Sequence, residues 1–115
     1  MNLRATNRDI GDTTVVDVSG RITLGEGSAL MRTLVRQLLD QKRKFIVLNL
    51  ADVSYIDSSG IGELVSSFTA VKKEGGELKL LNLTKKVHDL LLITKLFTVF
   101  DVHNDEEKAI ASFSR

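Results

Sequence analysis

The chain has 115 residues, of which 43% are hydrophobic and 27% are charged, a balance typical of a soluble domain with one hydrophobic core. The formal net charge is only +1, so no excess of positive charge favours binding to nucleic acid or to an acidic membrane. No cysteine is present, which excludes disulfides, thiolate nucleophiles and cysteine-ligated metals. Because there is also no apolar leader and no membrane-spanning run, we expect a cytoplasmic protein with a single domain over residues 1–115.

The first half of the chain alternates strand and helix patterns. A β-branched run over residues 13–19 predicts a strand that pairs with a weaker strand over residues 3–9. Apolar residues at 3.6-residue spacing then predict a helix over residues 28–41. An uninterrupted apolar run over residues 45–50 predicts a strand that is covered on both faces.

The second half continues the alternation. The predicted elements are a helix over residues 59–74 that ends at Gly75-Gly76, a strand over residues 77–83, a short helix over residues 85–93, a short strand over residues 98–100 and a last helix that begins at residues 105–108. This order predicts an α/β fold with a mixed or parallel central sheet of about four to five strands, flanked by about four helices. The strand over residues 45–50 should lie in the centre of the sheet.

The turn Asp57-Ser58-Ser59-Gly60 joins this central strand to the next helix. Ligand and partner sites in α/β folds commonly lie beyond the carboxyl ends of strands. The first N–H groups of a helix have no intrahelical partner and carry partial positive charge, so a phosphate on a serine there would be stabilised. One serine can be the helix N-cap while the other faces solvent, and the residue types alone do not choose between them. Asp57 can also act as a cap, or hold a hydroxyl group or the metal of a phosphate donor.

Enzymatic chemistry finds little support in the sequence. A serine nucleophile would need His88 or His103 as its base, and the surroundings of the serines are not G-x-S-x-G. The segment Gly60-Ile61-Gly62 lacks the third glycine of a dinucleotide fingerprint and the Gly-Lys-Ser/Thr of a P-loop. We expect these small residues to let the helix approach the sheet or to let a partner approach the helix. No metal site and no cofactor is expected, since potential ligands are not clustered.

Taken together, the strand, the Asp-Ser-Ser-Gly turn, the helix and the Gly-Gly turn resemble the STAS domain, specifically the small single-domain anti-sigma factor antagonists. The most specific segment is residues 46–62, and residues 16–22 and 75–80 add support. The resemblance implies a regulator that is a substrate and not an enzyme, with Ser58 as the phosphorylated residue. Ser59 is then the expected cap of the helix.

The resemblance also implies two protein partners and neither a nucleic acid nor a membrane. One is an anti-sigma factor serine kinase of histidine-kinase-like ATPase fold, which binds the unphosphorylated form and thereby releases a sigma factor. The other is a phosphatase that resets Ser58. The residues expected to contact the partner are Asp57, Ser58, Ser59, Gly60, Ile61, Gly62 and Thr23.

Two positions depart from the family's pattern. The family often has Asp shortly after the second strand, where this chain has Thr23, and often has Gly after the third helix, where this chain has Thr94-Lys95-Leu96. The first departure leaves open a second hypothesis, a STAS subunit of a larger signalling or lipid-transport complex that phosphorylation does not switch. A nucleotide-binding or hydrolytic enzyme, suggested by the glycines beside Ser58, is the third hypothesis.

Overall fold

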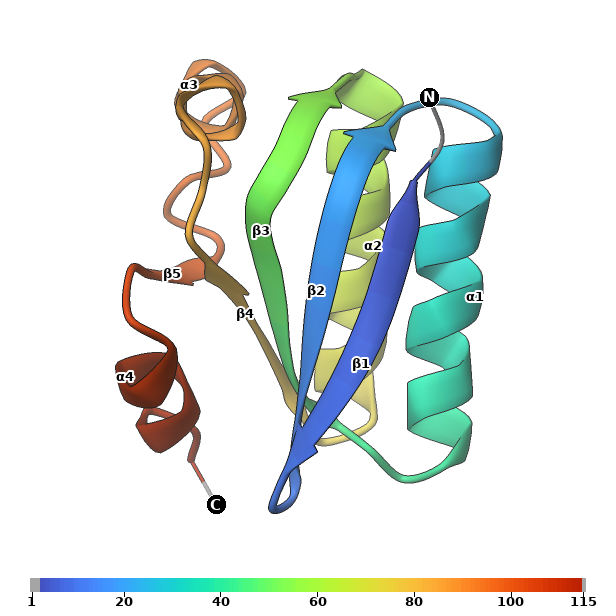
Figure 1. Ribbon diagram of the computed structural model, residues 1–115, viewed down its shortest axis with the longest axis vertical. Helices are drawn as coiled ribbons and strands as arrows, with labels where there is room; N and C mark the ends of the chain where they lie inside the picture. Colours follow the sequence, from blue (N-terminus) through green and yellow to red (C-terminus); the bar gives the residue numbers. More distant parts are fainter. Residues whose placement is uncertain (1–2, 115) are drawn as a thin grey trace.

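A buried strand forms the centre of the computed structural model, which describes residues 3–114. β3 (Phe45–Ile56) pairs in parallel with β2 (Thr13–Ile22) on one side and with β4 (Glu77–Leu81) on the other. β1 (Arg4–Ile10) is antiparallel to β2, and β5 (Asp101–His103) is parallel to β4 (Figure 1). The sheet order β1-β2-β3-β4-β5 therefore confirms the predicted central position of the third strand.

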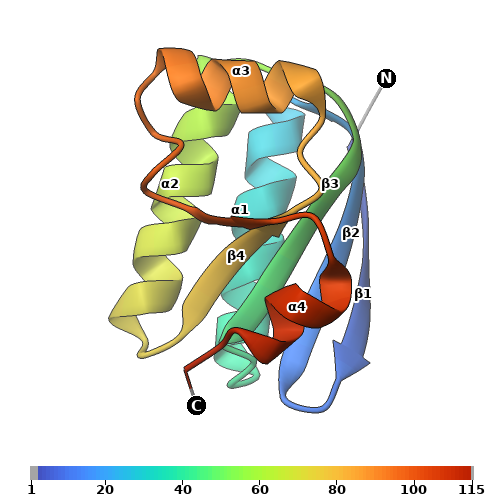
Figure 2. The same ribbon diagram turned by 90° about the vertical axis from the view of Figure 1, so that its left-hand side faces the viewer.

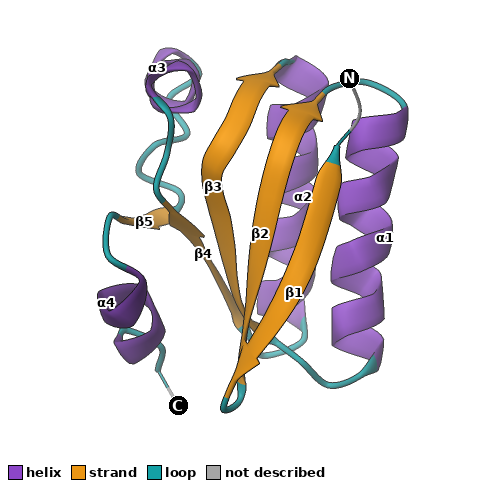
Figure 3. Cartoon of the chain, in the orientation of Figure 1, coloured by secondary structure: helices purple, strands orange, loops and turns teal. Residues whose placement is uncertain are grey.

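Four helices accompany the five strands within residues 3–114, which confirms the predicted α/β class with a mixed sheet (Figure 3). They are α1 (Glu26–Asp40), α2 (Ser58–Lys73), α3 (Lys85–Ile93) and α4 (Glu106–Ala111). The helices pack on both faces of the sheet, with α1 and α2 on one face and α4 on the other. Val16 and Leu48 pack in the main core together with Met31 of α1 and Leu64 of α2, whereas the preceding residues Val15 and Val47 pack with Ala109 of α4.

The helix α3 lies across one end of the layers and contributes Val87 and Leu91 to the main core (Figure 2). Its bounds agree with the predicted helix over residues 85–93. No helix within residues 3–114 combines the length and the apolar character that crossing a membrane requires.

β2 runs three residues past its predicted end and β4 ends two residues before its own, and two other strands differ more from their predictions. β3 continues six residues past the predicted end at residue 50, because its second half pairs with β2 up to the pair Ile22 and Ile56, across two register shifts. The prediction of a strand over residues 98–100 is wrong, since β5 begins at Asp101. Asp101 pairs in register with Lys79, and the His103 carbonyl accepts the N–H of Asn82, the residue after β4, at 2.9 Å, so pairing along β4 fixes the position of this strand.

Candidate functional site

The strands β2 and β3 end side by side, and each leads directly into a long helix. Ile22 and Ile56 are paired in register, and the Asp57 N–H donates to the Ile22 carbonyl at 3.3 Å. The β2–α1 loop therefore lies against the start of α2, at the edge where both strand arrows end in Figure 1. This arrangement brings Thr23 next to the Asp57-Ser58-Ser59-Gly60 turn, as expected for residues beyond neighbouring strand ends.

The N-cap of α2 is Asp57, so the prediction that Ser59 caps this helix is wrong. One carboxylate oxygen of Asp57 accepts the Gly60 N–H at 2.8 Å, and the other accepts the Leu24 N–H at 3.1 Å. The hydrogen bond from Gly60 is the main cause that holds the pKa of Asp57 below its usual range, with Leu24 contributing further. A single carboxylate thus fixes both the start of α2 and the loop that leads to α1.

The two serines of the turn have different surroundings. Ser58 is exposed in the first turn of α2, whereas Ser59 is half-buried and faces a cavity between the starts of α1 and α2. Because Asp57 supplies the cap, neither serine is needed for it. Ser58 is therefore the more exposed of the two serines.

The glycines of this turn serve two different purposes. A Cβ on Gly60 would lie 2.2 Å from the Ile22 carbonyl oxygen and 2.6 Å from Cγ1 of Ile56, so only glycine lets α2 pack this closely on the sheet. A Cβ on Gly62 would meet no atom within 4 Å. The expected close approach of helix and sheet is confirmed at Gly60, and Gly62 leaves open surface at which a partner could approach.

The cavity beside Ser59 has a volume of about 690 Å³ and includes residues that the sequence did not single out. Leu24 is 79% exposed at its rim. Glu63 is only 6% exposed and forms an ion pair of 3.0 Å with Arg32 of α1. Ile61 is only 4% exposed and packs in the core, so its effect on a partner would be through the position of α2 and not through contact. No sequence pattern points to Leu24 or Glu63, because only the folded structure brings them to this cavity.

The possible enzymatic groups lie elsewhere in the fold. His88 on α3 contacts Asp89, and Nε2 of His103 on β5 lies 3.1 Å from Asp101. Within residues 3–114 neither histidine has a hydrogen bond or ion pair with Ser58 or Ser59. The described residues also contain no group of three or more side chains suited to a metal ion. The turn consequently offers an exposed serine that neither histidine contacts within residues 3–114.

Comparison with known proteins adds family information to this geometry. The STAS domain family matches residues 4–109 of the chain. A curated relative, the anti-sigma-B factor antagonist of Bacillus subtilis (strain 168), is 36% identical over 95 residues, which span 83% of this chain and 85% of the relative. The anti-sigma F factor antagonist of Paenibacillus polymyxa is 24% identical over 110 residues, spanning 96% of this chain and 94% of the relative.

Solved structures share the fold at lower sequence identity. A crystal structure of a Thermotoga maritima protein matches with a TM-score of 0.87 and 22% identity, over 96% of this chain and 95% of that one. The Bacillus cell fate determinant SpoIIAA in its phosphorylated form matches with a TM-score of 0.73 and 20% identity, over 94% of this chain and 97% of that one. These two likenesses concern the fold alone.

Proposed function

This chain belongs to the STAS domain family, and we propose that it acts as an anti-sigma factor antagonist whose binding is switched by phosphorylation of Ser58. The unphosphorylated form binds an anti-sigma factor kinase of histidine-kinase-like ATPase fold and thereby releases the sigma factor. A phosphatase restores that form. The observation that carries the proposal is the exposed Ser58 in the first turn of α2, in a chain whose curated relatives are anti-sigma factor antagonists.

The choice of Ser58 over Ser59 follows from access. A kinase must enclose the attacking hydroxyl together with the γ-phosphate, so the exposed Ser58 is a better substrate than the half-buried Ser59 in the lining of a cavity. The phosphate adds about −1.5 to −2 charges at neutral pH, and the partial positive charge of the α2 N-terminus offsets part of it. Phosphorylation should therefore leave the fold intact.

The same phosphate opposes binding of the partner. At a packed interface it would lose its water beside the Asp57 carboxylate, which is ionised at neutral pH and whose pKa lies below its usual range. Burying a charge without a partner costs several kcal/mol, and a loss of about 3–4 kcal/mol weakens binding by two to three orders of magnitude. Leu24 and Gly62 line the cavity beside Ser59, the residue after Ser58, and with Thr23 they would provide the contact surface that the phosphate disrupts.

The proposal is tested with the anti-sigma factor kinases of the organism that carries this chain. Each kinase is incubated with ATP and the wild-type protein, Ser58→Ala or Ser59→Ala, and the modified residue is located by mass spectrometry. We expect phosphate on Ser58 in the wild type and in Ser59→Ala, and none in Ser58→Ala. Calorimetry should show that Ser58→Asp binds the kinase at least about 100-fold more weakly than the wild type. Modification at Ser59, or unchanged binding by Ser58→Asp, would contradict the proposal.

The alternative, a STAS subunit of a larger complex, is favoured by one observation. Thr23 contributes no charge, and its carbonyl accepts the N–H and the hydroxyl of Ser28 at 3.1 Å and 2.9 Å, so it serves the start of α1. Affinity purification from the source organism separates the two functions. Recovery of a membrane ATPase without any soluble kinase would favour the subunit, and recovery of a kinase would favour the antagonist.

A further inference from the structure

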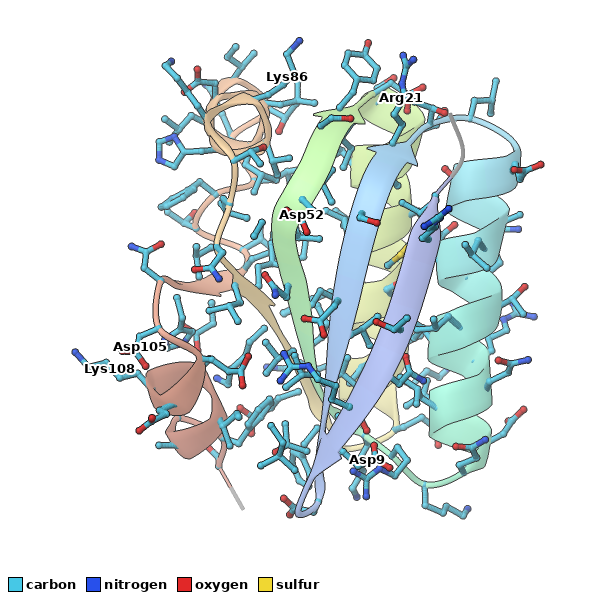
Figure 4. All side chains as sticks on the ribbon, in the orientation of Figure 1. Asp9, Arg21, Asp52, Lys86, Asp105 and Lys108 are labelled. Carbon is cyan, nitrogen blue, oxygen red and sulfur yellow. The ribbon has the colours of Figure 1, made fainter. Side chains whose placement is uncertain are left out.

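Three elements converge on the ring of Tyr55, near the end of β3. The Arg21 guanidinium carbon lies 5.0 Å from the ring centroid, and Nζ of Lys86 lies 5.1 Å from it. Arg21 is the register partner of Tyr55 on β2, and Lys86 comes from the first turn of α3. Figure 4 shows Arg21 and Lys86 at the same end of the molecule, where β2 and β3 end.

Both cations are exposed, and neither forms an ion pair with a carboxylate within residues 3–114. The neighbouring Lys85 is different, because its Nζ lies 2.6 Å from Asp89. The carboxylate of Asp57 in the following turn is ionised, but it accepts two backbone N–H groups and forms no ion pair with Arg21 or Lys86 within residues 3–114. The chain therefore positions two positive charges at this edge of the sheet and does not neutralise them.

The arrangement suits an anionic ligand for two physical reasons. Attraction to the face of an aromatic ring restricts two long and otherwise flexible side chains, so less conformational entropy is lost when they bind a partner. Two like charges near one ring also repel each other, and a negative group placed between them would relieve that repulsion.

The cations lie close to the proposed switch. Tyr55 precedes Ser58 by three residues, so their Cα atoms are at most about 11 Å apart. The Debye length is about 8 Å at physiological salt and about 30 Å at 0.01 M, so a phosphate on Ser58 would act on the charges of Arg21 and Lys86 most strongly at low salt. A phosphate of about −1.5 to −2 charges on Ser58 would offset most of the positive charge that Arg21 and Lys86 supply.

We propose that Arg21, Tyr55 and Lys86 form a basic docking surface for an acidic patch on the partner kinase, and that a phosphate on Ser58 neutralises this surface. The identity of the partner rests on the proposed function. The phosphate then acts twice, because it is costly to desolvate at the interface and also removes the attraction that draws the partner in. Two cations are fewer than the four to eight that recruit a protein to anionic lipid, so a protein partner fits them better.

The test with the kinase compares the double variant Arg21→Gln/Lys86→Gln with Lys85→Gln, a control that removes a paired cation from the same helix. At low salt the double variant should bind about fivefold or more weakly than the wild type, and added salt should weaken its binding much less. Lys85→Gln should stay within about twofold of the wild type. Equal affinity and equal salt dependence of wild type and double variant would overturn the docking surface.

A second measurement does not depend on the kinase. A hexaglutamate peptide is titrated into the ¹⁵N-labelled protein, and the amide shifts near Arg21, Tyr55 and Lys86 are followed by NMR. We expect shifts in the wild type and in Lys85→Gln, smaller shifts in Ser58→Asp and none in the double variant. If no kinase binds the wild type but the peptide produces this pattern, the proposed function fails while the surface stands. Absence of the pattern, or retention of the wild type but not the double variant on phosphatidylserine vesicles, would overturn the acidic protein partner.

Discussion

The carboxylate of Asp57 connects two segments that are far apart in the sequence. It accepts the N–H of Gly60, in its own helix, and the N–H of Leu24, which precedes α1. The loop and the turn that flank Ser58 are therefore held in one fixed relation before any partner binds. Such preorganisation lowers the entropy that binding would otherwise cost.

Asp57→Ala removes both hydrogen bonds and should lower the free energy of unfolding by about 1–2 kcal/mol, the usual effect of losing an N-cap. Asp57→Asn keeps an oxygen that can accept the Gly60 N–H, so it should cost less than the alanine variant. Urea denaturation at neutral pH measures both. As a comparison, Thr84→Ala removes the longer cap bond of 3.4 Å at the start of α3 and should also cost less. A wild-type midpoint for Asp57→Ala would show that the carboxylate does not stabilise the turn.

The sequence could not identify this cap, although it identified the turn. Asp57, Ser58 and Ser59 are all residue types that cap helices, and they follow one another. The choice is fixed by Leu24, whose N–H is brought to the second oxygen of Asp57 only by the pairing of β2 with β3. The contacts of Tyr55 with cations from β2 and α3 could not be read from the sequence for the same reason.

The helix α2 uses its two early glycines to meet different surfaces. Gly60 lies under the helix against the backbone of β2, and Gly62 lies on the outer side, where no atom would contact an added Cβ. The first glycine sets how closely the helix approaches the sheet, and thereby the height of Ser58 above the strand ends. Because Gly62 has no side chain, no atoms project from the outer side of the helix at this point of the cavity between α1 and α2.

These two glycines offer a matched pair of substitutions. Gly60→Ala places a methyl group against the Ile22 carbonyl and should destabilise the protein by about 2–3 kcal/mol or prevent folding. Gly62→Ala should stabilise it by up to about 1 kcal/mol, because alanine favours a helix interior. Urea denaturation measures the pair. Under the proposed function Gly62→Ala should nevertheless weaken kinase binding, and tighter binding by this more stable variant would argue against contact at Gly62.

Strands and helices differed in how well the sequence predicted them. Apolar residues at helical spacing located all four helices, because each buries one side in the core. The second half of β3 carries exposed residues such as Ala51, Asp52 and Ser54, so its pairing with β2 left no apolar pattern to detect. The last strand was predicted too early in the sequence because Phe100 is apolar and buried but does not belong to a strand.

Ion pairs connect the last two elements, β5 and α4, to the strands β4 and β1. Arg8 on β1 binds Asp17 on β2 and also Glu106 on α4, with N–O distances of 2.6 Å and 2.7 Å. Asp101 on β5 pairs with the buried Lys79 of β4. β5 has only three residues and α4 only six, so these ion pairs supplement the pairing of β5 with β4 and the packing of Phe113 on Phe45.

The stability of the whole protein should therefore fall in acid. The hydrogen bond from Arg8 lowers the pKa of Asp17, and although burial raises the pKa of Asp101, hydrogen bonds from Lys79 and His103 outweigh it and the net shift is also downward. Because both pKa values are lower in the folded protein than the usual 3.8, the stabilisation is complete above about pH 5 and is lost as the pH falls through the folded-state values.

Urea denaturation at a series of pH values between about 7 and 3 measures this loss. The variant Asp17→Asn/Asp101→Asn should be less stable than the wild type at neutral pH and should lose less stability on acidification, so the two curves converge. Asp52→Asn alters an exposed carboxylate that forms no ion pair within residues 3–114, and its curve should run parallel to that of the wild type. Hydrogen exchange should locate the neutral-pH loss first in β5 and α4. Parallel curves for the wild type and the double variant would show that these two carboxylates do not link the end of the chain to the sheet.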